Sequence, residues 1–249
     1  MKILTLNTQK AYQPDFKNFI VNVLNRGEYD FILLQEVTSS VSDMIKTASS
    51  EYQMINPFDP ELGEHTHGCV LYKNLFTLQK ELFVSFAILE PGFPRHGWGF
   101  TGGVFNYGGK RIFVGSAHLH PGLRKKRRME QLKLVKEKVM AEFGAITVVF
   151  GGDFNFGMPG EISCSEKILS PEFVRVTKGL GPTLDSRYTE KTSWGVARIA
   201  NILAKLGISI RLRADHVYID SLTVKSAPVR CRIVPDRVSD HLAVEVSIG

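Results

Sequence analysis

Short apolar runs alternate with helical patterns in the first part of the chain. Residues 2–7 (KILTLN) and 31–37 (FILLQEV) are apolar runs that end in polar residues, and each predicts a strand. Between them, residues 14–26 carry apolar side chains at helical spacing and Gly27 follows as a stop signal, which predicts a helix. A second helix is expected to begin at residues 38–39.

From residue 69 the pattern becomes one of short strands. The strand-like segments are CVLYK (69–73), FTLQKELFVSF (76–86), GGVFNY (102–107) and RIFVGSAHL (111–119). Tyr107-Gly108-Gly109 is typical of a hairpin turn between the last two.

The second half mixes both kinds of element. The expected elements are a helix over about 125–143, a strand from residue 147 (TVVF), a helix-like run near 193–206 after a Pro/Gly-rich loop, and the strands DHVYID (215–220), LTVKSAP (222–228) and HLAVEVSI (241–248). Strands for two sheets with helices outside them predict an α/β sandwich.

The totals limit the class of protein. At 249 residues, with no internal repeat and no Pro/Ser-rich linker, one domain over 1–249 is the simplest prediction. The three cysteines are scattered, which argues against a disulfide framework and a zinc site and favours a reducing, cytoplasmic location. No apolar stretch is long enough for a signal peptide or a membrane span, so stable membrane insertion is not expected, and we expect a monomer. The net charge of +6 favours an anionic partner.

Polar residues of a narrow chemical range collect at the ends of these strands. They are Asn7, Glu36, His118, Asp153, Asn155, Asp215, His216, Asp240 and His241. Each alone would be an ordinary turn or edge residue, but together they predict strand ends that converge on one polar cleft. Such a set supplies what phosphoester hydrolysis needs, namely carboxylates for Mg²⁺, donors for phosphoryl oxygens, and an acid that orients a histidine.

The ordered motifs LTLNTQ, LLQEV, SAHLHPG, GGDFN, ADHVYI and SDH resemble those of the endonuclease/exonuclease/phosphatase superfamily, over the whole chain from Asn7 to His241. The resemblance implies a four-layer, DNase I-like sandwich of two packed, mainly antiparallel sheets flanked by helices. It also implies a Mg²⁺-dependent phosphoester hydrolase, with Mn²⁺ as an alternative ion. The glycines before Asp153 are then expected to let the backbone turn sharply, so that Asp153 and Asn155 face a scissile phosphate.

The resemblance also implies a role for each of these strand-end residues except His216. Glu36 is expected to be the principal metal ligand, with Asn7 nearby and Asp240 as a second carboxylate. The other expected roles are an Asp153 that orients or deprotonates the attacking water, an Asn155 that holds a phosphoryl oxygen, a His241 that contacts the phosphate and is held by Asp215, and a His118 that also donates to the phosphate.

Four other histidines are expected to have no direct role. His120 and His216 are interpreted as supporting or structural residues, and His65 and His67 in GEHTHG as part of a solvated loop rather than a metal pair.

A run of five cations, Arg124, Lys125, Lys126, Arg127 and Arg128, stands at the start of the expected helix over 125–143. The helix dipole disfavours positive charge there, so helix stability does not explain the run. Because it follows His118 closely, it is interpreted as an anion-binding rim for a phosphate-rich substrate, with a merely solvated turn as the alternative.

Three interpretations of the function are left open. The pattern from His118 through Arg128 to Gln131 is similar to 5′-tyrosyl-DNA phosphodiesterases, and the basic charge mildly favours nucleic acid. A lipid or small phosphoester, as in sphingomyelinase-like relatives, is the alternative, and a binding module that kept the fold is a third. The segment 191–216 is either core or an apolar, basic lip that contacts substrate.

Overall fold

The protein folds around two β-sheets of six strands each. The computed structural model describes residues 1–9, 15–55, 68–86, 99–121, 124–143, 146–157, 159–185, 211–236 and 238–249. The first sheet contains, in spatial order, β13 (Val229–Ile233), β14 (Val244–Ile248), β1 (Lys2–Asn7), β2 (Phe31–Gln35), β4 (Gly68–Lys73) and β3 (Tyr52–Ile55). The second contains β5 (Thr77–Ser85), β6 (Gly99–Tyr107), β7 (Lys110–His118), β8 (Thr147–Asp153), β12 (Asp215–Asp220) and β9 (Phe173–Arg175). A two-stranded ribbon joins β10 (Leu184–Asp185) and β11 (Arg211–Leu212).

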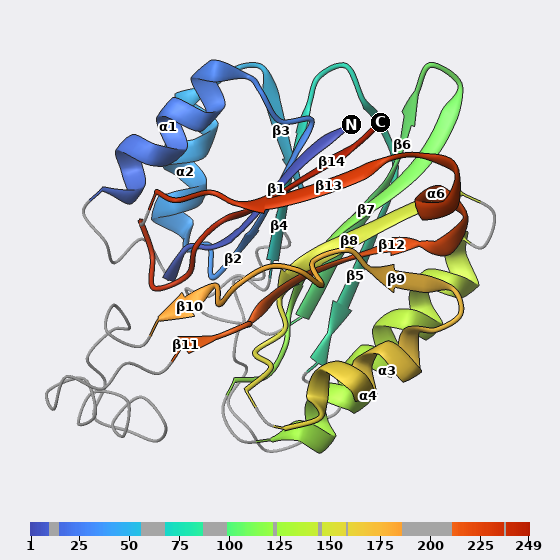
Figure 1. The fold of residues 1–249 in the computed structure, drawn as a ribbon. Coiled ribbons are helices and arrows are strands. Elements are labelled where there is room, and N and C mark those ends of the chain that lie inside the picture. Colours follow the sequence, from blue (N-terminus) through green and yellow to red (C-terminus); the bar gives the residue numbers. More distant parts are fainter. Residues whose placement is uncertain are drawn as a thin grey trace, which may run out of the picture.

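Helices cover the outer face of each sheet, which produces four layers (Figure 1). The helices are α1 (Phe16–Arg26), α2 (Ser39–Ala48), α3 (Lys125–Phe143), α4 (Glu161–Leu169) and the short α6 (Ser221–Ser226). The first two pack on the first sheet, and α3 and α4 pack on the second. No helix among the described residues is long and apolar enough to cross a membrane.

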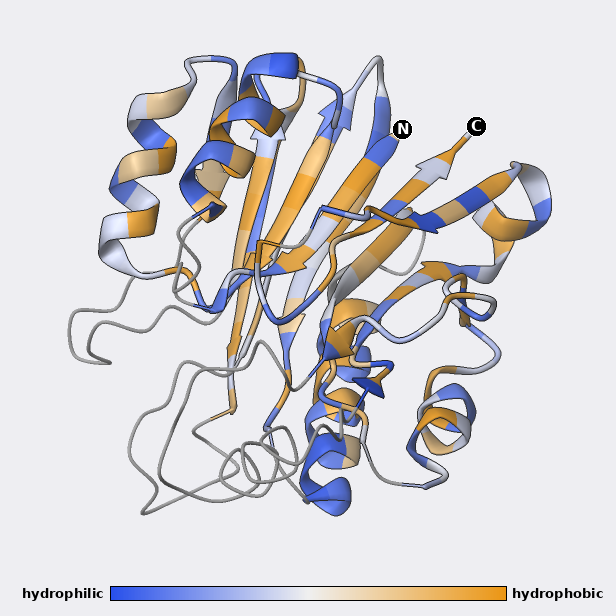
Figure 2. Cartoon of the chain, turned by 60° about the vertical axis from the view of Figure 1, so that its left-hand side comes forward, coloured by the Kyte–Doolittle hydropathy of each residue, from blue (hydrophilic) through white to orange (hydrophobic). Residues whose placement is uncertain are grey.

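Three apolar clusters fill the spaces between the layers. One lies between α1, α2 and the first sheet, with Ile20 and Leu34 buried in it. The second lies between the sheets and joins Leu33 of β2 to Val149 of β8. The third lies under α3 and contains Phe150. Because strands in both sheets are covered on both faces, they are apolar almost throughout, as the central strands in Figure 2 show.

Most of the expected elements are confirmed, and the prediction of two sheets with helices outside them is correct. The first helix ends at Arg26, and Gly27 follows in the left-handed region with φ 57°. Gly108 and Gly109 also have positive φ, as the tight turn between β6 and β7 requires. Both sheets are mixed, because β1 pairs parallel with β2 and β7 pairs parallel with β8.

The predicted strand LTVKSAP (222–228) is wrong. These residues begin in the helix α6, because Asp220 caps it: the Asp220 Oδ1 accepts a hydrogen bond from the Thr223 N–H at 2.8 Å. The strand of this region is β13, which starts only at Val229. The loop expected after residue 155 also contains a helix, α4. The helix-like run near 193–206 lies outside the described residues.

Arg128 does not belong to an exposed basic rim. Its side chain is 0% exposed and forms an ion pair with the equally buried Glu161 of α4, with an Nη2–Oε1 distance of 2.6 Å. The Arg128 Nη1 donates to the carbonyl of His120 at 3.0 Å, and Glu161 Oε2 accepts from the Gly157 N–H at 2.8 Å. The pair therefore fastens α3 and α4 to the chain segments that follow β7 and β8, whereas Arg124 and Lys126 are exposed.

Replacing Arg128 tests its place in the interior. Arg128→Met should lower the free energy of unfolding by about 3–5 kcal/mol, because it leaves the Glu161 carboxylate buried without its counter-charge. Lys126→Met, at a side chain that is 91% exposed, should change it by less than about 0.5 kcal/mol. Urea unfolding measures both. Equal stabilities for the two variants would contradict the structural role of Arg128.

Candidate active site

Asp153 is the last residue of β8. It lies at the edge of the sandwich that is formed by strand ends of both sheets. The glycines before it do not form a turn, because Gly151 and Gly152 lie within the strand. Their role is close packing: a Cβ on Gly152 would come within 2.0 Å of the Ala117 carbonyl oxygen, and φ there is 144°. The expectation of a glycine turn is therefore wrong, and the turn comes after Asp153.

Asn155 makes that turn in the left-handed region, with φ 51°. Its N–H donates to Asp153 Oδ1 at 2.8 Å, and its Nδ2 donates to the Leu119 carbonyl at 2.9 Å. The carboxylate that ends the strand thus stabilises the turn that follows it.

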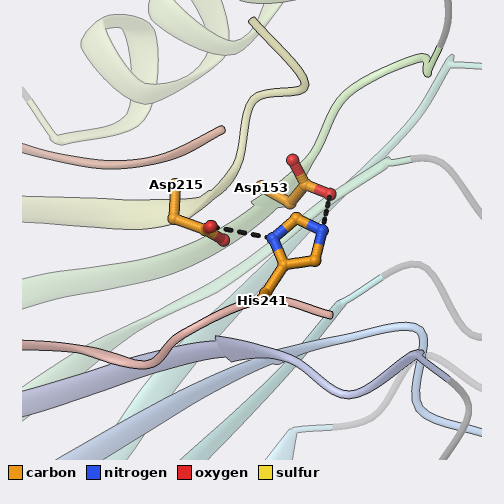
Figure 3. A group of neighbouring side chains, drawn as sticks. All are labelled: Asp153, Asp215 and His241. Carbon is orange, nitrogen blue, oxygen red and sulfur yellow. Dashed lines mark hydrogen bonds and ion pairs between the residues drawn. The ribbon is translucent and has the colours of Figure 1, made fainter. Parts of the chain in front are cut away.

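Asp215 and His241 meet although they come from different sheets. Asp215 begins β12, directly opposite Asp153 in the register, and His241 precedes β14. His241 Nδ1 lies 2.8 Å from Asp215 Oδ2, and Nε2 lies 3.6 Å from Asp153 Oδ2 (Figure 3). The imidazole is thus held between two carboxylates, with its Nδ1 bonded to one of them.

The ends of β1, β2 and β7 bring three more predicted residues to this place. The Asn7 Nδ2 donates to Asp153 Oδ2 at 2.9 Å and to Glu36 Oε1 at 3.3 Å. His118 Nε2 lies 3.7 Å from Glu36 Oε1 and 3.9 Å from Asp153 Oδ2. Asp153, the common neighbour, therefore lies within reach of an amide and two imidazoles.

Glu36 differs from its neighbours in exposure. Its side chain is 27% exposed, whereas that of His118 is 5% exposed and that of Asp153 2%. The Thr8 hydroxyl donates to the carbonyls of Gln35 and Glu36, at 3.0 Å each. The Glu36 carboxylate is therefore partly exposed to solvent, while the Glu36 backbone is held by Thr8.

Strained backbone is concentrated at this edge. Among the described residues, the only non-glycine residues with positive φ are Gln9 (48°), Glu36 (56°) and Asn155 (51°). Each follows the end of a strand that carries a site residue. Such conformations cost free energy and persist where the surroundings enforce them, most often at functional sites.

Burial and charge act against each other on the titratable groups. Burial raises the pKa of Asp153 and the Asp215 carboxylate adds to this, while His241, His118 and the Asn7 hydrogen bond oppose it. Burial alone would lower the pKa of His241, but the carboxylates of Asp215, Asp153 and Asp240 outweigh it and hold that pKa well above its usual value.

Asp240 lies at the same edge but with other contacts. Its Oδ1 accepts from the Ser239 hydroxyl at 3.2 Å and lies 3.9 Å from His241 Nε2. Its N–H donates to Gln9 Oε1 at 3.3 Å. No described contact tests its predicted place as a metal ligand, which stays a prediction.

The supporting histidines are buried close by. Burial and the nearby Arg175 guanidinium lower the pKa of His216 to about 4, and its ring contacts Phe154 and Phe156. The His120 N–H donates to Gln131 Oε1 at 2.9 Å. His65 and His67 lie outside the described residues. So do residues 191–210, which make up most of the segment 191–216 that is either core or a substrate lip.

Two threonines that the sequence did not single out support the site. Thr8 binds the backbone of Glu36, and the Thr183 hydroxyl accepts from the Asp215 N–H at 3.1 Å. Thr8 lies directly after Asn7, so the first motif contained a signal for it. Nothing in the local pattern around Thr183 indicates its contact 32 residues away.

Comparison with known structures shows the same fold. D. rerio TDP2 complexed with single strand DNA product matches with a TM-score of 0.78 and 15% identity, covering 100% of this chain and 98% of that one. The mannosyl-6-phosphatase of Bacteroides thetaiotaomicron matches with a TM-score of 0.73 and 15% identity, covering 100% and 99%. Beta toxin of Staphylococcus aureus matches with a TM-score of 0.71 and 16% identity, covering 99% of each chain. The search of curated proteins found no match.

The sequence itself shows the family. The model of the Endonuclease/Exonuclease/phosphatase family matches residues 4–241. This range includes every strand-end residue of the site, from Asn7 to His241. In the structure, the described acids, amide and imidazoles of this range meet at one edge of the sandwich. The chain belongs to the Endonuclease/Exonuclease/phosphatase family and is a metal-dependent phosphoesterase.

Proposed function

We propose that this protein is a Mg²⁺-dependent phosphodiesterase that acts on nucleic acid. One observation carries the proposal: a chain of hydrogen bonds and ion pairs joins five side chains, namely Asp153, His241, Asn7, Glu36 and His118. This group contains the carboxylates, amide and imidazoles that hydrolysis of a phosphoester needs.

The residues around Glu36 fit a hard divalent cation. Glu36 offers a partly open carboxylate, and the Asp153 carboxylate lies close by, since the Asn7 Nδ2 donates to both. Asp153, Asp215 and His241 also place one ligand atom each within 4.8 Å of one another. In that group, however, His241 Nδ1 is already bonded to Asp215, so we assign the ion to Glu36, with Asp240 as a further carboxylate and Asn7 nearby, where its Oδ1 accepts from the Gln9 N–H at 2.9 Å. A bound Mg²⁺ or Mn²⁺ would neutralise charge on the phosphoryl oxygens.

The side chains divide the chemistry among them. Asp153 accepts a proton from the attacking water or orients it, since its Oδ2 lies 3.9 Å from His118 Nε2 and 3.6 Å from His241 Nε2, the proposed donors to the phosphoryl group. His241, held by Asp215, donates through Nε2 to the phosphoryl oxygens where negative charge develops. His118 donates to the same oxygens through Nε2. The Asn155 amide, whose Nδ2 already donates to the Leu119 carbonyl, would donate to them through its second N–H.

The substrate class is inferred from charge and from one similar structure. TDP2, of the same fold, has been solved with a single strand DNA product. Here Arg124 and Lys126 are exposed, and Lys125 and Arg127 are half-buried, at the start of α3 just after the segment that carries His118. These four residues form the proposed basic rim for a nucleic acid backbone.

A small or lipid phosphoester remains the second candidate. A mannosyl-6-phosphatase and a beta toxin share the fold, and a basic rim would also suit an anionic headgroup.

All three cysteines are free thiols, which supports the proposed cytoplasmic location. The proposal also keeps a single domain over 1–249 and a monomer.

Replacing the central residues should stop turnover without unfolding the protein. Asp153→Asn and His241→Ala should each lower kcat by roughly 10³-fold or more, because the base or the charge-stabilising donor is lost. Asp43→Asn, at a side chain that is 76% exposed, is the matched control and should not change kcat. Circular dichroism checks the fold. Near-wild-type rates for both site variants would refute the assignment.

Glu36→Gln should act mainly on the metal. The Mg²⁺ concentration for half-maximal activity should rise by at least the roughly tenfold typical of a disturbed metal site. Isothermal titration of Mg²⁺ without substrate measures the same loss independently of turnover. Unchanged Mg²⁺ binding in Glu36→Gln would contradict its role as the principal ligand.

A panel of phosphoesters with Mg²⁺ and with EDTA tests the substrate class. We expect hydrolysis of single-stranded, duplex or 5′-adducted DNA or of RNA, and complete loss of activity with EDTA. Sphingomyelin and p-nitrophenyl phosphate should be poor substrates. Preference for either of these would favour the second candidate, and full activity in EDTA would contradict metal dependence.

The basic rim can be removed while Arg128 is kept. Serine at all four positions 124–127 should raise KM for DNA and reduce the slope of log KM against log salt by about 0.7–0.9 for each lost phosphate contact. The control replaces four exposed cations elsewhere, Lys110, Arg111, Lys133 and Lys138, and removes the same charge. Equal KM values in the two variants would show that the run is ordinary surface.

A further inference from the structure

Thr183 bonds to both sides of the Asp215–His241 pair. Its hydroxyl oxygen accepts from the N–H groups of Ala214 at 3.2 Å and Asp215 at 3.1 Å. Its carbonyl accepts from the Leu242 N–H at 2.7 Å, and its own N–H donates to the Leu212 carbonyl at 2.9 Å. The residue is 1% exposed, so these four bonds are made in the interior.

The residues after Thr183 continue the same connection. Leu184 forms a bridge with His241, and the Asp185 N–H donates to the Asp240 carbonyl at 3.0 Å. On its other side, β10 pairs with β11, which leads into β12. The β10 strand therefore lies between the segment that carries His241 and the segment that leads to Asp215.

This position matters because the two catalytic partners belong to different sheets. Asp215 begins a strand of the second sheet and His241 precedes a strand of the first, so no ladder within one sheet sets the distance between them. Two of the four bonds of Thr183 use its own backbone atoms and could be kept by any residue other than proline at that place. The hydroxyl alone binds the amides of Ala214 and Asp215, and a buried amide without an acceptor is unfavourable.

We propose that the Thr183 hydroxyl is a positioning group that holds Asp215 at hydrogen-bond distance from His241. The proposal rests on the proposed function for its effect on catalysis, but not for its effect on the geometry of the pair. Without the hydroxyl, the start of β12 shifts to satisfy its free amides, and the carboxylate moves away from the imidazole. A catalytic group that is displaced from its productive position lowers the rate of the chemical step.

Two substitutions separate the hydroxyl from the methyl group. Thr183→Val removes the hydroxyl at nearly constant shape and should lower kcat on the order of 10–100-fold, with KM for the substrate unchanged within about threefold. Thr183→Ser keeps the hydroxyl and should stay within about threefold of the wild type. The matched control is Thr101→Val, because Thr101 is 0% exposed and its hydroxyl has no partner among the described residues; its kcat should not change.

If Thr183→Val does not fold, Thr183→Ser and Thr183→Ala still decide the question. Both lack the methyl group and they differ only in the hydroxyl. The serine variant should have a kcat at least about tenfold above that of the alanine variant. Equal kcat values for the two would overturn the proposal.

Proton NMR measures the pair without any substrate. The His241 Nδ1–H, bonded to a buried carboxylate, should give a low-field resonance that is absent in His241→Ala. We expect this resonance to be shifted or lost in Thr183→Val or Thr183→Ala and kept in Thr183→Ser and Thr101→Val. An unchanged resonance in the variants without the hydroxyl would refute the positioning role, whether or not the protein hydrolyses nucleic acid. Full activity of His241→Ala would instead refute the proposed function alone.

Discussion

His241 and Asp215 reach one another across the boundary between two sheets, with 2.8 Å between Nδ1 and Oδ2. This hydrogen bond can form only if the first residue of β12 and the segment before β14 lie next to one another across the two sheets. The sandwich provides that alignment, because the apolar cluster between the sheets joins the strands just behind the site. The parallel pairs β1–β2 and β7–β8 bring Asn7 beside Gln35 and His118 beside Asp153. The rest of the site is built around this bond.

Close backbone packing is the second condition. Gly152 allows β8 to lie against the main chain of Ala117, where a Cβ would collide with the carbonyl oxygen. Asp153 is thereby kept level with His118 on the neighbouring strand. The buried Arg128–Glu161 pair then holds the segments that follow these two strands. Residues that take no part in the chemistry therefore determine where the catalytic groups lie.

The sequence predicted the parts that depend on local pattern. Apolar runs identified most of the strands, and the polar residues at their ends identified the residues that the structure brings together, from Asn7 to His241. The prediction for the glycines before Asp153 is wrong because a glycine in a strand and a glycine in a turn have the same sequence signal. The prediction for Arg128 is wrong for another reason. Burial of an arginine depends on a partner, here Glu161, that is 33 residues away. Thr183 was missed for the same reason.

The most direct test is a crystal structure of the wild-type protein, from crystals soaked with Mg²⁺ and inorganic phosphate. The account predicts the ion at the Glu36 carboxylate and phosphate oxygens within hydrogen-bond distance of His241 Nε2 and His118 Nε2, with the Asp215–His241 bond intact. An ion and a phosphate bound away from these groups, or an imidazole of His241 turned away from Asp215, would contradict it.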